Sequence, residues 1–373
     1  MTRRSRRCAL SLTVAVLLAS APLVPGAGAA YADPRPATIE AWQQSSSARL
    51  VADGSLSDVL ALSAVNVWAV GQQEIWDVWK NRGTIRHWNG SAWNEVGIRD
   101  STGAGNLRSV AAAGPGEVWA LGDGHDGLPY LAKGDAAGFD RVQVAGLWAG
   151  DWLGGIDVRG GKVVAVGSRD DNGLIVTGQG GSWTAQKIKE KGALYGVSAG
   201  FAVGDTGEAP LIMRQSAGGT WKAMPVPQIP GGYLRDVQVD NPKRALAVGG
   251  IFHGPDDVEP LVLSWNGKKW TRDKLPLLDA RLYGVTGDGK GRNWIAGYDA
   301  ARPAEGFLMS RSKDGYQVIR GGGALKGRDA VRLQAVAYLP GKGSVWAVGH
   351  VVDAADRYTD VVESFGPAAP TQS

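Results

Sequence analysis

The chain has 373 residues, a formal charge of +4, a single cysteine, 55 glycines and 15 tryptophans. All four excess positive charges lie within the first seven residues, and beyond them 36 basic side chains balance 36 acidic ones. A balanced chain gives no electrostatic reason to expect a nucleic acid as partner. Because Cys8 lies in the N-terminal segment, the rest of the chain cannot form a disulfide, a thiolate metal site or a thiol nucleophile.

Residues 1–32 are typical of a secretory signal peptide. Four arginines precede an apolar stretch over residues 8–24, and a segment rich in Pro, Gly and Ala ends at Ala30-Tyr31-Ala32, which matches the Ala-x-Ala cleavage pattern. We therefore expect cleavage after Ala32 and a secreted, extracellular protein, exported by either the general or the twin-arginine route. No segment has the roughly 20 apolar residues that cross a membrane, so no membrane association is expected.

Residues 33–366 contain a sequence unit that occurs seven times. Six units open with a Leu-x-x-Val run and the third opens with Leu153-Gly154-Gly155-Ile156. Each continues into a short apolar stretch that ends in Gly, as in Val67-Trp68-Ala69-Val70-Gly71. The units repeat every 40 to 51 residues, which is the length of a four-stranded propeller blade. This spacing predicts an all-β, seven-bladed β-propeller, followed by a flexible tail over 367–373. The opening leucines are Leu56, Leu107, Leu153, Leu194, Leu234, Leu282 and Leu333.

The first complete unit shows how one blade is built. Alternating or short apolar runs predict its four strands over 56–60, 67–71, 84–88 and 92–96. Asn89-Gly90 precedes the last of these, and this pair favours a two-residue type I′ hairpin because both central positions need a positive φ. Asn266-Gly267 and Gly180-Gly181 occupy the same place in later units.

The last unit lacks an outer strand, and the N-terminal segment can supply it. No outer strand follows Phe365. Residues Thr38 to Trp42 resemble the outer strand of the first unit, and pairing them with the strand that ends at Phe365 would close the ring and remove its open edges. The alternative is a disordered leader.

The connections between second and third strands are polar and rich in acidic residues, and all of them leave the same face of a propeller. We expect this face to have a negative potential, although acidic loops also simply keep a secreted protein in solution. His125, His253 and His350 are assigned to these loops, but they come from separate blades and match no metal-binding spacing. No metal site is therefore expected.

The loop from Gln72 to Lys80 is the best candidate for a functional site. Trp76 and Trp79 provide more aromatic surface than a turn needs, and Glu74 and Asp77 are close to them in the sequence. Exposed tryptophan is typical of a protein-binding hot spot or of a surface that stacks on sugars. The alternative is that both side chains fold back and fill the mouth of the channel.

Sequence motifs for catalysis are missing. The chain has no Gly-x-Ser-x-Gly nucleophile elbow, no P-loop and no strand-linked Gly-x-Gly-x-x-Gly. Loop carboxylates could form a glycosidase pair, but a sequence cannot show their separation. We expect a protein that is not an enzyme and has no cofactor, with a carbohydrate-binding propeller or a polysaccharide hydrolase or lyase as alternatives.

The Val-Trp-Ala-Val-Gly strands, the Trp-Asn-Gly-x-x-Trp hairpins, the Arg-rich signal and the cysteine-free mature part resemble the autolysis-inducing propellers secreted by filamentous actinomycetes. We expect a monomer. The resemblance implies that the protein binds a thermolysin-type neutral metalloprotease and promotes its autolysis. It also implies a glutamine-donor substrate of a secreted transglutaminase. Because mobile backbone lets a glutamine enter another enzyme's cleft, the candidate donors are Gln43, Gln44, Gln72 and Gln73, unless these are ordinary surface glutamines.

Overall fold

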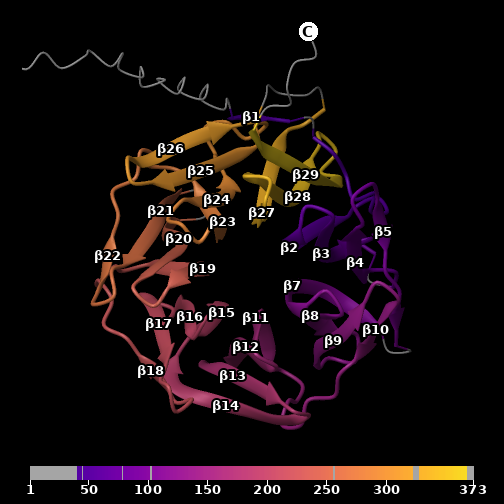
Figure 1. Ribbon diagram of the computed structural model, residues 1–373, viewed down its shortest axis with the longest axis vertical. Helices are drawn as coiled ribbons and strands as arrows, with labels where there is room; N and C mark the ends of the chain where they lie inside the picture. The colour runs from indigo at the N-terminus through magenta and orange to yellow at the C-terminus, as the bar shows by residue number, and fades with distance from the viewer. Residues whose placement is uncertain are drawn as a thin grey trace, which may run out of the picture. The chain divides into compact units, whose positions relative to one another are not determined.

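The computed structural model describes residues 40–43, 45–77, 79–100, 103–254, 257–321 and 327–367. They form seven sheets that surround a central axis (Figure 1), and all neighbouring strands pair antiparallel except β6 and β10, which pair parallel. This confirms the predicted seven-bladed propeller. The predicted signal peptide and the tail beyond residue 367 lie outside the described residues. Pro367 itself is the last residue of the final strand, so the ordered sheet extends one residue beyond the predicted boundary.

Each blade is a meander that runs outwards from the axis. Blade one contains β2 (Ser55–Ser63), β3 (Asn66–Gln73), β4 (Arg82–Trp88) and β5 (Trp93–Glu95). Blade two contains β7 (Ala104–Gly114), β8 (Glu117–Gly124), β9 (Pro129–Asp135), β10 (Gly138–Arg141) and the added edge strand β6 (Ile98–Arg99). Blade three contains β11 (Trp152–Arg159), β12 (Lys162–Arg169), β13 (Asn172–Gln179) and β14 (Ser182–Lys191). Blade four contains β15 (Ala193–Ser198), β16 (Phe201–Asp205), β17 (Pro210–Gln215) and β18 (Trp221–Ala223).

The remaining blades follow the same order. Blade five contains β19 (Gly232–Asn241), β20 (Arg244–Gly254), β21 (Asp257–Trp265) and β22 (Trp270–Arg272). Blade six contains β23 (Arg281–Gly287), β24 (Asn293–Tyr298), β25 (Phe307–Ser312) and β26 (Gly315–Arg320). Blade seven contains β27 (Ala330–Leu339), β28 (Ser344–Val352), β29 (Tyr358–Pro367) and, as its outer strand, β1 (Glu40–Trp42).

The pairing of β1 with β29 closes the ring, as the sequence predicts. Trp42 pairs with Phe365, and their rings meet edge to face at 6.1 Å. The described strand begins at Glu40, and the two preceding residues of the predicted strand lie outside the described part of the chain. The connection that follows is fastened to the same sheet, because the Asp360 carboxylate accepts hydrogen bonds from the backbone N–H groups of Ala48 and Leu50.

Every opening leucine is buried and is followed by a β-bulge in the inner strand. In blade one, for example, the register shifts between Leu56 and Asp58, and the same shift follows the opening leucine of each other blade. A bulge leaves one residue unpaired and re-aims its side chain. The seven unpaired residues all line the central channel: Ser57, Arg108, Gly154, Tyr195, Arg235, Tyr283 and Gln334.

The bulge also explains the glycine that ends each apolar second strand. A Cβ at Gly71 would lie 2.0 Å from the carbonyl oxygen of Ser55, and one at Gly167 would lie 1.8 Å from that of Trp152. The bulged inner strand therefore approaches the second strand too closely for any side chain. The Leu-x-x-Val pattern of the inner strand and the Val-Trp-Ala-Val-Gly pattern of the second strand therefore form the same contact, between the bulge and the glycine.

The outer hairpins match the predicted turn in one case and differ from it in others. At Gly180-Gly181 both residues have positive φ, as a two-residue turn requires. At Asn89-Gly90 the prediction is wrong, because Trp88 pairs with Trp93 and leaves four residues in the loop. The Asn89 side-chain oxygen accepts two backbone hydrogen bonds there, so only the glycine needs a positive φ. Asn266-Gly267 behaves in the same way.

Candidate functional site

The loop between β3 and β4, residues 74–81, borders a cleft where blades one and seven meet. The cleft has a volume of about 550 Å³. Three segments surround it: the connection from β1 to β2, the 74–81 loop and the connection from β28 to β29. We call it the first-loop cleft, and it is lined by Val51, Ala52, Asp53, Glu74, Trp76, Asp77, Trp79 and Arg357.

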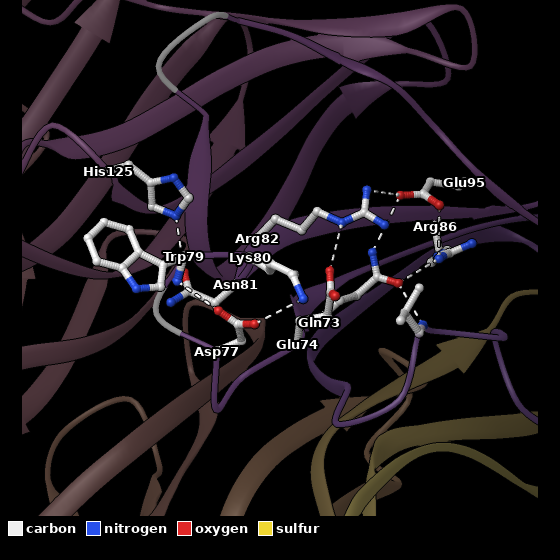
Figure 2. Close-up of polar contacts among 11 residues, drawn as sticks. Gln73, Glu74, Asp77, Trp79, Lys80, Asn81, Arg82, Arg86, Glu95 and His125 are labelled. Atoms are coloured by element: carbon white, nitrogen blue, oxygen red, sulfur yellow. Dashed lines mark hydrogen bonds and ion pairs between the residues drawn. The ribbon is translucent and has the colours of Figure 1, made fainter.

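Hydrogen bonds within the 74–81 loop hold its described residues in a defined shape (Figure 2). The Asp77 carboxylate accepts a hydrogen bond from the N–H of Trp79 at 3.0 Å and forms an ion pair with Lys80 at 3.3 Å. Its backbone carbonyl accepts a further hydrogen bond from Asn81 at 2.7 Å. These contacts turn the chain so that the tryptophan side chains face outwards while the polar groups close the turn.

The base of the loop is fixed by the side chain of Gln73, which is buried (Figure 2). Its carbonyl oxygen accepts hydrogen bonds from the backbone N–H of Val51 at 2.8 Å and from Arg86 at 3.1 Å. Its amide nitrogen donates to Glu95 at 3.4 Å. The prediction that Gln72 and Gln73 lie in the mobile loop is therefore wrong, since both belong to β3 and the second of them is needed to satisfy buried partners.

Trp76 and Trp79 are the most informative side chains of the cleft. Trp79 is 92% exposed and Trp76 is 60% exposed. The Trp76 ring meets Tyr358 edge to face at 5.3 Å, which fixes one side and leaves the other open. Neither tryptophan lines the central channel, whose wall in the described residues comes from the inner strands. The alternative that they fill the channel mouth is therefore wrong.

The opposite wall of the cleft comes from blade seven and from the connection that precedes β2. The single Nε–H of Arg357 is shared between the two oxygens of the Asp53 carboxylate, at 2.8 and 2.9 Å, and this contact lowers the pKa of Asp53. Tyr358 lies behind this pair and stacks on His350 at 4.3 Å. No local pattern in the sequence marks these residues, because they meet the 74–81 loop only when β1 closes the ring. The predicted pairing of the N-terminal strand with the last unit was the one sequence feature that placed the first and last blades side by side.

Of the three histidines assigned to these loops, only His125 lies in one. His350 is a buried residue of β28, where burial lowers its pKa to about 4 and Ser55 hydrogen-bonds its Nδ1 at 2.8 Å. His253 belongs to β20. His125 does lie in a loop, and its Nε2 contacts Asn81 at 3.1 Å. Within the described ranges, no three His, Cys, Asp or Glu side chains gather in a group that could hold a metal ion.

The acidic face is less negative than its loops suggest, because basic side chains from the strands reach it. Asp126 pairs with Arg141 of β10 at 2.7 Å. Asp170 pairs with Lys187 of β14 at 2.7 Å. Further pairs of this kind are Asp123 with Arg108, Glu259 with Arg272 and Asp299 with Arg320. The expectation of a strongly negative face counted only the loops and missed these partners.

Comparison with known proteins identifies the fold. No protein-family model matches the chain, and no curated protein matches it. A structure of YCF48 bound to a D1 peptide matches with a TM-score of 0.58 at 14% identity, over 88% of this chain and 97% of that one. The extracellular domain of the BT4673 one-component system from B. thetaiotaomicron matches with a TM-score of 0.54 at 10% identity, over 86% and 40%. The WD40 domain of Toxoplasma gondii coronin matches with a TM-score of 0.53 at 9% identity, over 90% and 88%.

These identities are low, so the similarity shows a β-propeller scaffold and carries no activity with it. In the part of the chain that the structure describes, no helix is long and apolar enough to cross a membrane.

Proposed function

We propose that this chain is a secreted, non-enzymatic protein whose first-loop cleft binds a thermolysin-type neutral metalloprotease and promotes autolysis of that protease. The observation that carries the proposal is the exposure of Trp79 and Trp76, 92% and 60%, on a loop held by hydrogen bonds. Tryptophans displayed on a rigid loop are the side chains most often found at the energetic centre of a protein interface.

The hydrogen bonds made by the described residues of the loop favour binding. An interface loses affinity when loops must be ordered on association, and a loop that is already ordered avoids this cost. The Gln73 network and the Asp77 turn provide that order before any partner arrives. Charged groups of both signs, Arg357 and Glu74 among them, surround the aromatic centre, as at the polar rim of an interface.

The sequence resemblance supplies the identity of the partner. The repeated strands and hairpins resemble those of the dispase autolysis-inducing protein, whose role requires binding alone because the protease performs the cleavage. No catalytic residue is therefore assigned. The hydrolase alternative is less favoured, because several loop carboxylates are engaged with basic side chains, as Asp126 is with Arg141.

The proposed role as a transglutaminase substrate now depends on the N-terminal glutamines. Gln43 is exposed and follows β1 directly. Gln44 lies outside the described residues. Gln73 is buried and bonded, so we assign the donor role to Gln43 and Gln44 and expect Gln73 to be inert.

Incubating the purified protein with a thermolysin-like protease tests this function. We expect the protease half-life to shorten in proportion to the added protein, with fragments that the protease itself produces. A catalytically inactive protease variant should bind and stay intact. An unchanged half-life would contradict the proposal. A glycan array tests the carbohydrate-binding alternative, which the exposed Trp79 ring also suits.

A further inference from the structure

A second cavity opens at the axis of the ring, on the side of blades four, five and six. Its volume is about 430 Å³. We call it the axial mouth. It shares no lining residue with the first-loop cleft. The side chains that matter for its chemistry are Tyr195, Asp205, Tyr233, Arg235, Phe252 and Arg281.

The position of Arg235 follows directly from the fold. It is the unpaired residue of the bulge after Leu234, so its side chain is turned towards the channel. Its guanidinium carbon lies 5.2 Å from the centre of the Tyr195 ring and 5.8 Å from that of Tyr233. Among the described residues no carboxylate forms an ion pair with it. The two rings hold the cation in place, while its N–H groups remain able to donate to a ligand.

Positive charge accumulates around this arginine. Arg281, two residues before the corresponding bulge position of blade six, lines the same cavity. The charges of Arg235 and Arg281 both act on the Tyr233 hydroxyl and lower its pKa against the larger effect of burial, which raises it. In the described wall of the cavity Asp205 is the only carboxylate, and it already accepts a hydrogen bond from the N–H of Gly207 at 2.7 Å. Among the described lining residues, two arginines therefore face a single carboxylate.

The other wall of the axial mouth is apolar. Phe252 is 54% exposed at the end of β20, which is unusual for a large apolar side chain, and Val258 lies beside it in the cavity wall.

Burial raises the pKa of Tyr195 to about 12, so its hydroxyl keeps its proton at physiological pH. The cavity thus offers the guanidinium of Arg235 on one side and an apolar surface on the other.

We propose that the axial mouth binds the carboxylate of a ligand that carries an apolar group next to it. A planar carboxylate matches the forked donors of Arg235, and the adjacent apolar group would contact Phe252. Both the C-terminus of a peptide and a free organic acid have this chemistry. A sugar fits less well, because Arg235 already lies over the ring faces of Tyr195 and Tyr233. A metal cation would be repelled by the two arginines. The proposal does not depend on the proposed function.

Calorimetric titration at low ionic strength tests the proposal. The probes are a short peptide ending in leucine with a free carboxylate, the same peptide with an amidated C-terminus, N-acetyl-leucine and inorganic phosphate. We expect the free-carboxylate peptide to bind and the amidated peptide to bind about tenfold more weakly or worse, since a charge-assisted contact is lost. Binding of N-acetyl-leucine as tight as that of the peptide would identify a free acid as sufficient, and weaker binding would identify a chain terminus.

Variants localise the effect. Arg235→Gln should weaken carboxylate binding about tenfold. Arg49→Gln, an exposed arginine on the connection between β1 and β2, should bind like the parent protein. Equal affinity for the free and amidated peptides in the parent protein would overturn the proposal, even if a variant failed to fold. Binding of phosphate without binding of carboxylates would also overturn it. Full affinity in folded Arg235→Gln, or no binding of either carboxylate probe at millimolar concentration, would do the same.

Discussion

The carboxylate of Glu40, in the strand that completes blade seven, forms a two-point ion pair with the guanidinium of Arg292, which precedes β24 of blade six. The same guanidinium lies over the Trp294 ring at 4.7 Å. The N-terminal strand is thus fastened to the neighbouring blade as well as to its own sheet. Ring closure therefore depends on a side-chain contact in addition to the β1–β29 hydrogen bonds.

Removing this contact should loosen the closure slightly. We expect Glu40→Gln to lower the free energy of unfolding by about 0.5–1 kcal/mol, because both partners are partly exposed and water screens the pair. Thermal or urea unfolding measures this change. Glu208→Gln, an exposed acid in blade four, is the matched control and should have no effect. If Glu40→Gln costs as much in an Arg292→Ala background as alone, the pair does not contribute.

Gln73 should matter for folding and Gln43 should not. Gln73→Ala removes the acceptor of the Val51 N–H and one of the two acceptors of Arg86, which keeps its ion pair with Glu95. Unsatisfied buried groups of this kind cost about 1–3 kcal/mol each. Urea unfolding should show a loss of about 2 kcal/mol or more. Gln43→Ala, at an exposed position, should match the parent protein. Equal stability of the two variants would show that the buried amide does not support the loop.

The close contact of the bulge predicts a strict requirement for glycine at the end of each second strand. A Cβ at Gly71 would lie 2.0 Å from a backbone carbonyl, so Gly71→Ala must displace the inner strand and should destabilise the protein by about 3 kcal/mol or more. At Gly97 an added Cβ has nothing within 4 Å, and Gly97→Ala should leave the melting temperature nearly unchanged. Calorimetric melting of both variants provides the comparison, and tolerance of Gly71→Ala would contradict the bulge account.

Asp58 should make stability depend on pH. Its carboxylate faces the channel, where it accepts hydrogen bonds from Val110 N–H and the Ser109 hydroxyl, and burial raises its pKa from 3.8 to about 7. The folded protein therefore retains a proton that the unfolded chain releases. The stabilising contribution of this proton is complete below pH 3.8 and is lost as pH rises through about 7.

The measurement is urea unfolding from pH 4 to pH 8 for the parent protein and for Asp58→Asn, which cannot titrate. The parent protein should lose stability relative to the variant as pH rises. The difference between the two curves reports the titration of Asp58 together with its coupling to Asp236, whatever the absolute cost of the substitution. A difference that stays constant across this range would contradict the raised pKa.

The sequence predicted the ring and its closure because both depend on local backbone geometry that repeats. Leu56 and Gly71 are conspicuous in the sequence since their bulge contact occurs once in every blade. The pairing of Trp42 with Phe365 was predictable for the same reason, as the final unit lacked one strand.

The parts that the sequence did not predict depend on contacts between segments far apart in the chain. Gln73 looked like a loop residue because nothing nearby in sequence shows that Val51 and Arg86 would bond to it. Arg235 lies in an inner strand, directly after an opening leucine, so a search for functional residues in the loops does not reach it. Comparing that position across the seven units would have revealed the channel wall.

The central claim is that the first-loop cleft binds a protein partner. The direct measurement is the affinity of the immobilised, catalytically inactive metalloprotease for the parent protein and for the Trp76→Ala/Trp79→Ala variant, together with the melting temperature of each. Hot-spot tryptophans each contribute about 2 kcal/mol or more, so the double substitution should weaken binding by about a thousandfold. The melting temperature should change little, because both side chains are largely exposed. Unchanged affinity in a folded variant would contradict the claim.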